Sequence, residues 1–269
     1  MSRVPGNRAR LFLLCRRTLR YIRTLTLSIV IPAYNEERRL PPTLDALFDW
    51  LDRSAYRDVE VLIVDDGSRD GTAAVVELRA RSEPRIRLVK NPSNRGKGYS
   101  VRHGMMEARG AWMLMTDADL SAPIAELPKL FQAAEAQHAV VAIGSRSLDR
   151  SLIGVHQARA RELSGIFFNR VMRLVTGLPF SDTQCGFKLY RRDAAQEIFS
   201  RQLLAGFGFD VEDLVIAQRL GLAAVEVPVR WDNVEGTKVS LLNGVSSFAE
   251  LFAIRWNAIR GRYDRPVQS

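Results

Sequence analysis

Residues 111–120 read AWMLMTDADL, an apolar run that stops at two aspartates, Asp117 and Asp119. The run is apolar at consecutive positions, which is typical of a strand that is buried on both faces. A buried carboxylate is costly unless it is paired or bound to a cation. The stretch therefore predicts a buried strand that ends either in a solvated turn or at a metal site.

Runs of the same character recur through the first half of the chain. They are LSIVIP at 27–32, VEVLIVDD at 59–66, the shorter IRLVK at 86–90 and AVVAIGS at 139–145. Segments with helical character separate them, at about 40–53, 70–81, 97–108 and 124–136. Such alternation indicates βαβ units, so we predict an α/β fold with a mostly parallel central sheet and helices on both faces.

Polar side chains follow several of these strands at the point where each one ends. Tyr34 and Glu36 come after the first strand, Asp66 ends the second, and Arg146 follows the last. In open α/β sheets, ligands bind just beyond the carboxyl ends of the strands. We therefore expect these side chains and the two aspartates of the opening stretch to converge on one cleft.

The pattern changes after residue 150. We predict a helix at about 158–176, a strand at 186–190, a helix near 210–220 and a strand at 223–231. Further on, apolar residues recur at helical spacing and form one stripe, made of Leu241, Val245, Phe248, Phe252, Trp256 and Ile259. This stripe either packs on the domain as core or lies in a membrane interface, with Arg255, Arg260 and Arg262 near the headgroups.

The net charge of +9 is concentrated at the two ends of the chain. Residues 1–25 contain seven arginines and no acid, and from Arg255 onward four arginines face one acid. Basic ends favour contact with a polyanion, either a membrane surface or nucleic acid, although a solvated arm is the alternative. We therefore predict a basic arm at 1–25, an α/β domain at 26–240, and an amphipathic helix with a basic tail at 241–269.

Composition and missing motifs exclude several classes of protein. The 269 residues are 46% hydrophobic, which is enough for one large core. Cys15 and Cys185 cannot form a disulfide framework or a zinc site, which favours a reducing, cytosolic setting. No apolar run reaches the roughly 18 residues of a spanning helix. G-x-G-x-x-G is absent, which argues against a dehydrogenase, and the lack of a nucleic-acid-binding motif leads us to expect no such partner.

The residue types at the predicted cleft suit a nucleotide diphosphate. The carboxylates of Asp117 and Asp119 offer the hard oxygens that Mg²⁺ or Mn²⁺ prefer, and such ions often bridge substrate phosphates. Glu36 and Asp66 can accept hydrogen bonds from a base or a ribose, and Tyr34 offers a face for stacking. Lys97, in NRGKGYS at 94–100, precedes a helix and can approach a phosphate.

Several short motifs follow one another in a fixed order. They are VIPAYNE, VDDGSRDGT, RGKGYSVRHGM, DADLSAP, IGSR, DTQCGFKLY, FDVEDL, and EVPVRW followed by EGTK. In this order they resemble family 2 glycosyltransferases over about residues 27–262. The resemblance is closer to the polyprenyl-phosphate sugar synthases, which include the dolichyl-phosphate β-glucosyltransferases and bacterial relatives. It implies a GT-A fold and inverting, metal-dependent transfer of a hexose, with UDP-glucose the favoured donor and a polyprenyl phosphate the acceptor. Relatives of this kind carry membrane spans, and the sequence shows none. We therefore expect a cytoplasmic enzyme held peripherally at the inner face of the cell membrane, with the arginine-rich N-terminus as a substitute for a span.

The resemblance further implies roles for individual residues. The nucleotide pocket would be lined by Pro32, Tyr34, Glu36, Val64 and Asp66. Asp117, Ala118 and Asp119 would hold the diphosphate through the metal, with Asp119 the strongest candidate ligand. Arg146 and Lys238 would bring positive charge to phosphates, and Gln184 would lie near the sugar.

The acceptor decides whether a general base is needed. A lipid phosphate is already an anion at neutral pH, whereas a hydroxyl acceptor must lose a proton. Asp210 and Glu212, in GFDVED, are candidate bases in the second case, or else simple charges at the start of a helix. Transfer from GDP-mannose and transfer to a soluble hydroxyl compound stay open as alternatives.

Overall fold

The computed structural model describes residues 27–155, 169–232 and 241–267. The predicted basic arm at 1–25, most of the predicted helix at 158–176, and Lys238 lie outside these ranges. Side chains of the helical residues 241–248 are likewise outside the description.

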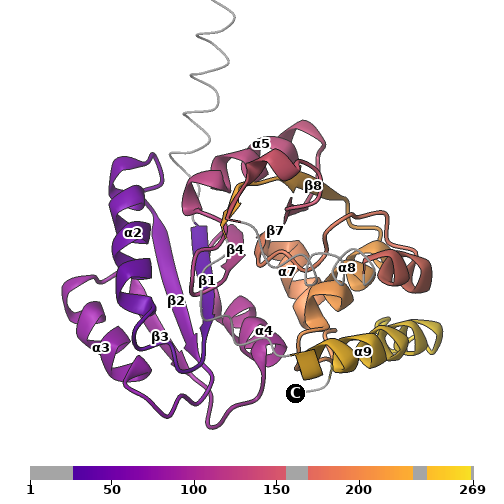
Figure 1. Ribbon diagram of the computed structural model, residues 1–269, viewed down its shortest axis with the longest axis horizontal. Helices are drawn as coiled ribbons and strands as arrows, with labels where there is room; N and C mark the ends of the chain where they lie inside the picture. Colours follow the sequence, from indigo (N-terminus) through magenta and orange to yellow (C-terminus); the bar gives the residue numbers. More distant parts are fainter. Residues whose placement is uncertain (1–26, 156–168, 233–240, 268–269) are drawn as a thin grey trace, which may run out of the picture.

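A seven-stranded sheet forms the centre of the molecule, with the strand order β3-β2-β1-β4-β7-β5-β8 (Figure 1). Its strands are β1 (Leu27–Ala33), β2 (Val59–Asp65), β3 (Ile86–Lys90), β4 (Trp112–Thr116), β5 (Val141–Ser145), β7 (Phe187–Arg191) and β8 (Ala224–Pro228). All neighbours are parallel except β7, which runs antiparallel to both β4 and β5. The predicted α/β class with a mostly parallel sheet is confirmed.

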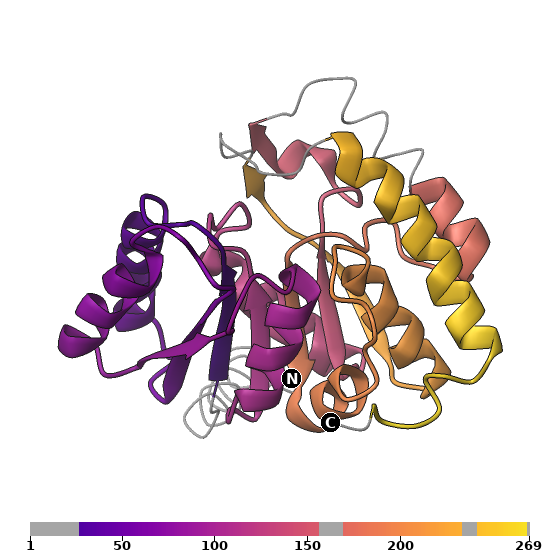
Figure 2. The same cartoon turned by 90° about the horizontal axis from the view of Figure 1, so that it is seen from below.

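Helices cover both faces of the sheet (Figures 1 and 2). Those on one face are α2 (Leu40–Arg53), α3 (Thr72–Ser82) and α5 (Leu127–Ala136), and those on the other are α4 (Lys97–Glu107), α7 (Arg192–Phe199) and α8 (Phe209–Arg219). Strand β1 shows how the sequence builds two cores, because successive side chains of a strand point to opposite faces. Ile29 and Ile31 belong to the same core as the buried face of α2, whereas Val30 belongs to the core that α4 and α8 share.

The second half of the described chain adds smaller elements. The 3₁₀ turns η1 (Ile124–Glu126) and η2 (Arg150–Leu152) precede α5 and β6. Strand β6 (Ile153–Val155) pairs in parallel with β9 (Trp231–Asp232), apart from the central sheet. Residues 169–176 are helical and end before Gly177, whose φ of 75° suits a residue without a Cβ.

The last helix, α9 (Leu241–Ile259), confirms the predicted helix, and the described members of its predicted stripe lie outside the core. Leu251, Ile254 and Ala258 are buried in the same core as α8. Phe252 and Trp256, which belong to the predicted stripe, are 62% and 55% exposed. Core packing is therefore carried by the neighbouring face of the helix. No helix within the described ranges is long and apolar enough to cross a membrane.

The strand order places the candidate site. β1 is hydrogen-bonded to β2 on one side and to β4 on the other, so the order reverses direction between β1 and β4. Crevices for ligands form at such switch points, beyond the carboxyl ends of the strands. The segments after β1 and β4, which begin at Tyr34 and Asp117, lie at this point.

Candidate functional site

The turn after β4 carries the two aspartates of the opening stretch. Both carboxylates are partly exposed, and Ala118 between them is buried. The hydroxyl of Thr43 in α2 donates to the carbonyl oxygen of Ala118 at 2.7 Å, which ties the turn to the helix beside it. One oxygen of Asp119 accepts from the backbone N–H of Ser121 at 3.0 Å. The other has no hydrogen-bond donor among the described residues, so it is available to a ligand.

Asp117 is held by a lysine. The Lys97 ammonium, at the start of α4, lies 2.6 Å from Oδ1 of Asp117. Burial disfavours the charged form of Lys97, but the carboxylates of Asp117 and Asp210 outweigh this and raise its pKa. Gly186, just before β7, allows the carboxylate to fit, because a Cβ there would overlap it. Lys97 was predicted to approach a phosphate, and it lies at the turn where a diphosphate is expected.

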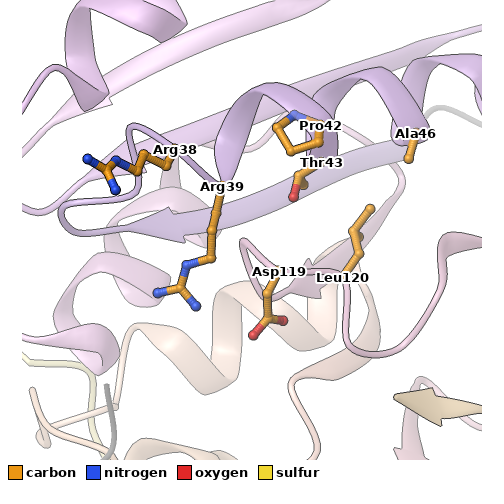
Figure 3. A pocket seen from close by; sticks show the side chains of 7 residues that line it. All are labelled: Arg38, Arg39, Pro42, Thr43, Ala46, Asp119 and Leu120. Atoms are coloured by element: carbon orange, nitrogen blue, oxygen red, sulfur yellow. The ribbon is translucent and has the colours of Figure 1, made fainter. Parts of the chain in front are cut away.

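A pocket of about 260 Å³ opens between α2 and this turn (Figure 3). It is lined by Arg38, Arg39, Pro42, Thr43, Ala46, Asp119 and Leu120. The side chains of Arg39 and Asp119 extend to the same side of the pocket (Figure 3). Arg39 also pairs with Glu36 at 2.7 Å, so the predicted nucleotide residue Glu36 is already neutralised at the rim.

The turn fits a divalent cation that a substrate completes. Within the described residues, no cluster of three or more His, Cys, Asp or Glu side chains could hold a metal by itself. Asp117 and Asp119 supply hard oxygen donors, and one oxygen of Asp119 is free for coordination. Mg²⁺ and Mn²⁺ commonly use one or two carboxylates and take their other ligands from water and substrate phosphates. The donor set therefore suits an ion that arrives with a diphosphate.

The predicted nucleotide residues divide into two groups. Pro32 and Tyr34 are half-buried at the end of β1, where they can meet a ligand. Val64, which pairs with Pro32 across β1 and β2, has a fully buried side chain against Gly104. The side chain of Val64 therefore fills the core, and the predicted place of this residue in the lining of the nucleotide pocket stays a prediction.

Asp66 organises the loop that precedes α4. Its carboxylate accepts from the amide of Asn91 at 2.7 Å and from the backbone N–H groups of Arg95 and Gly96 at 2.9 and 2.8 Å. The side chain is buried. These bonds fix the position of Gly96 and hence of Lys97 behind it. The structure thus gives Asp66 a positioning role, and its contact with a nucleotide stays a prediction.

Arg146 follows β5 and is anchored by an acid that the sequence did not single out. Its guanidinium binds Asp182 through two nitrogens, at 2.6 and 2.8 Å, and stacks over Trp231 at 5.5 Å. Burial opposes ionisation of Asp182, but Arg146 outweighs it and lowers the pKa of that carboxyl. Gln184 lies in the same loop, where its backbone N–H donates to Asp182 at 3.3 Å. The two predicted residues therefore share one anchor.

Asp210 begins α8 beneath the site. The Lys188 ammonium, which is fully buried on β7, lies 2.6 Å from the Asp210 carboxylate and 3.7 Å from that of Asp213. Tyr190 donates to Asp213 at 2.6 Å. Asp210 is only 4% exposed, so its carboxylate has a cation beside it and almost no surface from which to take a substrate proton. The geometry favours a structural ion pair over the predicted general base.

Glu212, the second candidate base, is fully buried and bonded on all sides. It accepts from the backbone N–H groups of Leu203 and Leu204 at 3.1 and 2.8 Å and from the hydroxyl of Tyr263 at 2.8 Å. Burial raises the pKa of Glu212 to about 7. This carboxyl joins the C-terminal segment to the loop before α8 and does not face the cleft.

Some residues of the site were not recognised in the sequence. Asp182, Asn91 and Gly186 support predicted residues and have only their loop positions as a signal. Lys188 was not recognised because it lies within an apolar strand. A lysine between Phe187 and Leu189 is nevertheless a signal, because a buried cation needs acidic partners, here two acids on one helix face. Cys185 is buried in the core beside these residues.

Comparison with known proteins agrees with this geometry. Residues 28–199 match the family described as Glycosyl transferase family 2. A dolichyl-phosphate beta-glucosyltransferase of Trichomonas vaginalis is 36% identical over 84% of this chain and 72% of its own length. The Homo sapiens protein of the same name is 35% identical over 80% and 70%.

Solved structures show the same fold. Mannosyl-3-phosphoglycerate synthase from Rubrobacter xylanophilus has a TM-score of 0.66 at 20% identity, over 95% of this chain and 80% of that chain. Glucosyl-3-phosphoglycerate synthase from Mycobacterium tuberculosis, solved with Mn²⁺, UDP-glucose and phosphoglyceric acid, has a TM-score of 0.64 at 21% identity, over 88% and 82%. The chain therefore belongs to glycosyl transferase family 2, has the GT-A fold and is a glycosyltransferase.

Proposed function

We propose that this enzyme transfers glucose from UDP-glucose to a polyprenyl phosphate such as dolichyl phosphate, with inversion and with the help of Mg²⁺ or Mn²⁺. The observation that carries the proposal is the turn after β4, where Asp119 keeps one carboxylate oxygen available beside the Lys97–Asp117 pair. The names of the curated relatives support the donor sugar and the lipid acceptor. A related fold solved with Mn²⁺ and UDP-glucose supports the metal and the nucleotide.

The site residues bind two anionic groups, the diphosphate of the donor and the phosphate of the acceptor. When bound, the divalent ion stabilises the charge that develops on the leaving diphosphate. Asp119 and Asp117 hold that ion, and Lys97 keeps Asp117 in position. Pro32, Tyr34, Glu36 and Asp66 are proposed to contact the nucleoside. These last four contacts and the sugar contact of Gln184 rest on the resemblance and on position at the sheet edge.

Arg146 is proposed to bind the phosphate of the acceptor. Its pairing with Asp182 fixes the guanidinium in one orientation, and a planar cation suits an oxyanion with several acceptor oxygens. Lys238, outside the described residues, is proposed to add a second positive charge. With the acceptor already ionised, the transfer needs positioning and charge stabilisation rather than a base. The ion pair between Asp210 and Lys188 is consistent with that requirement.

The test is sugar transfer from two donors to two acceptors. Labelled UDP-glucose and GDP-mannose are each incubated with the enzyme, Mg²⁺ or Mn²⁺, and either detergent-dispersed polyprenyl phosphate or glycerol phosphates. We expect labelled lipid from UDP-glucose alone. Lipid labelled from GDP-mannose would show that the donor is GDP-mannose. A product formed only on the soluble compound would show that the acceptor is not a lipid phosphate and would refute the proposal.

We also propose that the enzyme works peripherally at a membrane and carries its basic arm at 1–25 toward anionic lipid. The support is the location of a polyprenyl phosphate, whose chain is buried in a bilayer, together with the basic ends of the sequence. The matched test is binding to anionic vesicles by the whole chain and by a chain that lacks residues 1–25. Equal binding by the two proteins would refute a role for the arm.

A further inference from the structure

Helix α9 has two apolar faces, of which the fold uses one. Leu251, Ile254 and Ala258 face the core, while Phe252, Trp256 and Ile259 are 62%, 55% and 64% exposed. Exposed residues at positions 249, 252, 256 and 259 are spaced by three or four and form one outward stripe. These exposed fractions show that the described part of the chain leaves this side of α9 open. A contiguous apolar surface of this kind marks a site of interaction.

The charges around the outward stripe have one sign. Every exposed residue from 249 to 260 is apolar or arginine: Ala249, Phe252, Arg255, Trp256, Ile259 and Arg260. The guanidinium of Arg260 lies over the ring of Trp256 at 4.4 Å, and no described carboxylate pairs with Arg255 or Arg260. Aromatic and aliphatic side chains flanked by unpaired arginines match the boundary between acyl chains and anionic headgroups.

We propose that the outward stripe of α9 is the surface by which the enzyme docks on an anionic lipid bilayer. Phe252, Trp256 and Ile259 enter the acyl boundary, and Arg255 and Arg260 meet the lipid phosphates. The proposal rests on the proposed function in that a lipid acceptor gives the enzyme a reason to reach a membrane. It assigns the contact to a described helix, separately from the basic arm.

The position of α9 links docking to the site. Glu250, on the turn of α9 beside the stripe, accepts from the backbone N–H of Gly208 at 2.8 Å. The same loop contacts the start of α4, where the N–H of Tyr99 donates to the carbonyl oxygen of Ala205 at 3.2 Å. Lys97, which holds Asp117, is two residues from Tyr99. One short loop thus separates the docking helix from the candidate metal turn.

The test is sedimentation of the full-length protein with vesicles of equal parts phosphatidylcholine and phosphatidylglycerol, without any acceptor. The variants are Phe252→Ser with Trp256→Ser, and the matched control is Leu78→Ser, a 66% exposed leucine on α3 at the opposite end of the molecule (Figure 1). Because each large side chain contributes roughly a tenfold gain when it leaves water, we expect the double variant to bind at least about tenfold more weakly. The control should bind as the wild type does.

High salt separates the two possible membrane contacts, since it screens the basic arm more than it weakens apolar insertion. The tenfold difference between wild type and double variant should therefore persist at high salt. Equal binding by these two proteins would overturn the proposal. The proposal would also fail if analytical ultracentrifugation showed a wild-type dimer that the double variant loses while both proteins bind vesicles equally. A second copy of the chain would then cover the stripe.

Activity on detergent-dispersed polyprenyl phosphate distinguishes this proposal from the proposed function. We expect the double variant to keep wild-type turnover there, because no named catalytic side chain is altered. If vesicle binding depends on the stripe but no lipid product forms with any protein, docking stands and the acceptor assignment fails. If product forms and binding is unaffected by the substitutions, docking fails and the acceptor assignment stands.

Discussion

Replacing Lys188 by methionine isolates the energetic role of the buried charges beneath the site. The ammonium of Lys188 has no exposure and lies 2.6 Å from the Asp210 carboxylate, 2.8 Å from the Asp210 carbonyl oxygen and 3.7 Å from the Asp213 carboxylate. Methionine has a similar length and no charge, so Lys188→Met leaves two acids without their cation. Removing one partner of a buried ion pair costs about 3–5 kcal/mol. Since domains are stable by about 5–15 kcal/mol, we expect a variant that folds but unfolds at much lower urea.

The pH dependence of this loss follows from the two acids. Without the cation, the pKa of Asp210 or Asp213 rises further in the folded state, while in the unfolded chain both stay ionised above about pH 5. The folded variant therefore binds more protons than the unfolded one, and its stability falls as pH rises. One extra proton gives a slope of about 1.4 kcal/mol for each pH unit, so the loss should be smaller at pH 5 than at pH 8.

The assay is urea unfolding followed by circular dichroism across this pH range. Lys90→Met is the control, because Lys90 forms an ion pair with Glu77 in which both side chains are about half exposed. That variant should unfold as the wild type does. Adding Asp210→Asn to Lys188→Met should recover part of the stability at pH 8. A Lys188→Met protein as stable as wild type at pH 8, or one with no pH slope, would refute the reasoning.

Three further predictions use other residues of the site. Burial raises the pKa of Glu212 to about 7 from 4.5, so ionisation of this carboxyl lowers the free energy of unfolding by about 3 kcal/mol as pH rises between those values. In urea titrations, Glu212→Gln should lose this pH-dependent fall in stability, and an unchanged pH profile would contradict the prediction. Gly186→Ala should displace Asp117, because the added Cβ would overlap its carboxylate. We expect kcat/KM for sugar transfer to fall by about a hundredfold at nearly unchanged Tm. Wild-type kinetics would show that the close approach of Gly186 to Asp117 is unimportant. Arg146→Lys keeps the charge but loses one of the two hydrogen bonds to Asp182. We expect the free energy of unfolding, measured by thermal unfolding, to fall by about 1–3 kcal/mol and the KM for the acceptor to rise. An unaltered KM would show that Arg146 is not part of the acceptor site.

The sequence was informative wherever apolar runs alternate with helical segments. Residues 27–32, 59–66 and 86–90 predicted three strands within a residue or two, because strands buried on both faces leave continuous Val and Ile runs. The antiparallel direction of β7 could not be predicted, since apolar periodicity does not encode strand direction. For a similar reason, the sequence left open whether the predicted stripe of α9 packs in the core or faces outward. When two adjacent faces of a helix are apolar, spacing alone does not say which one packs.

The candidate site was predicted in outline but not in its internal pairing. Polar residues after buried strands located Asp119 and Arg146, because carboxyl ends of parallel strands share one edge. Pairing depends on segments far apart in the chain. Arg146 meets Asp182, and Lys188 meets Asp210, only after β7 inserts between β4 and β5.

The most direct test of the account is the binding of UDP, with and without Mn²⁺, by the wild type and by Asp119→Asn. We propose that the turn after β4 binds a cation together with a diphosphate, and that the available oxygen of Asp119 is the main ligand. Isothermal titration calorimetry should show that Mn²⁺ strengthens UDP binding by at least about tenfold, or about 1.4 kcal/mol, in the wild type. Asp119→Asn should lose that gain, whereas Asp45→Asn, a control on the outer side of α2 where Asp45 pairs with Arg79, should keep it. If Asp119→Asn retained the full effect of Mn²⁺, the metal site would lie elsewhere and the central claim would be wrong.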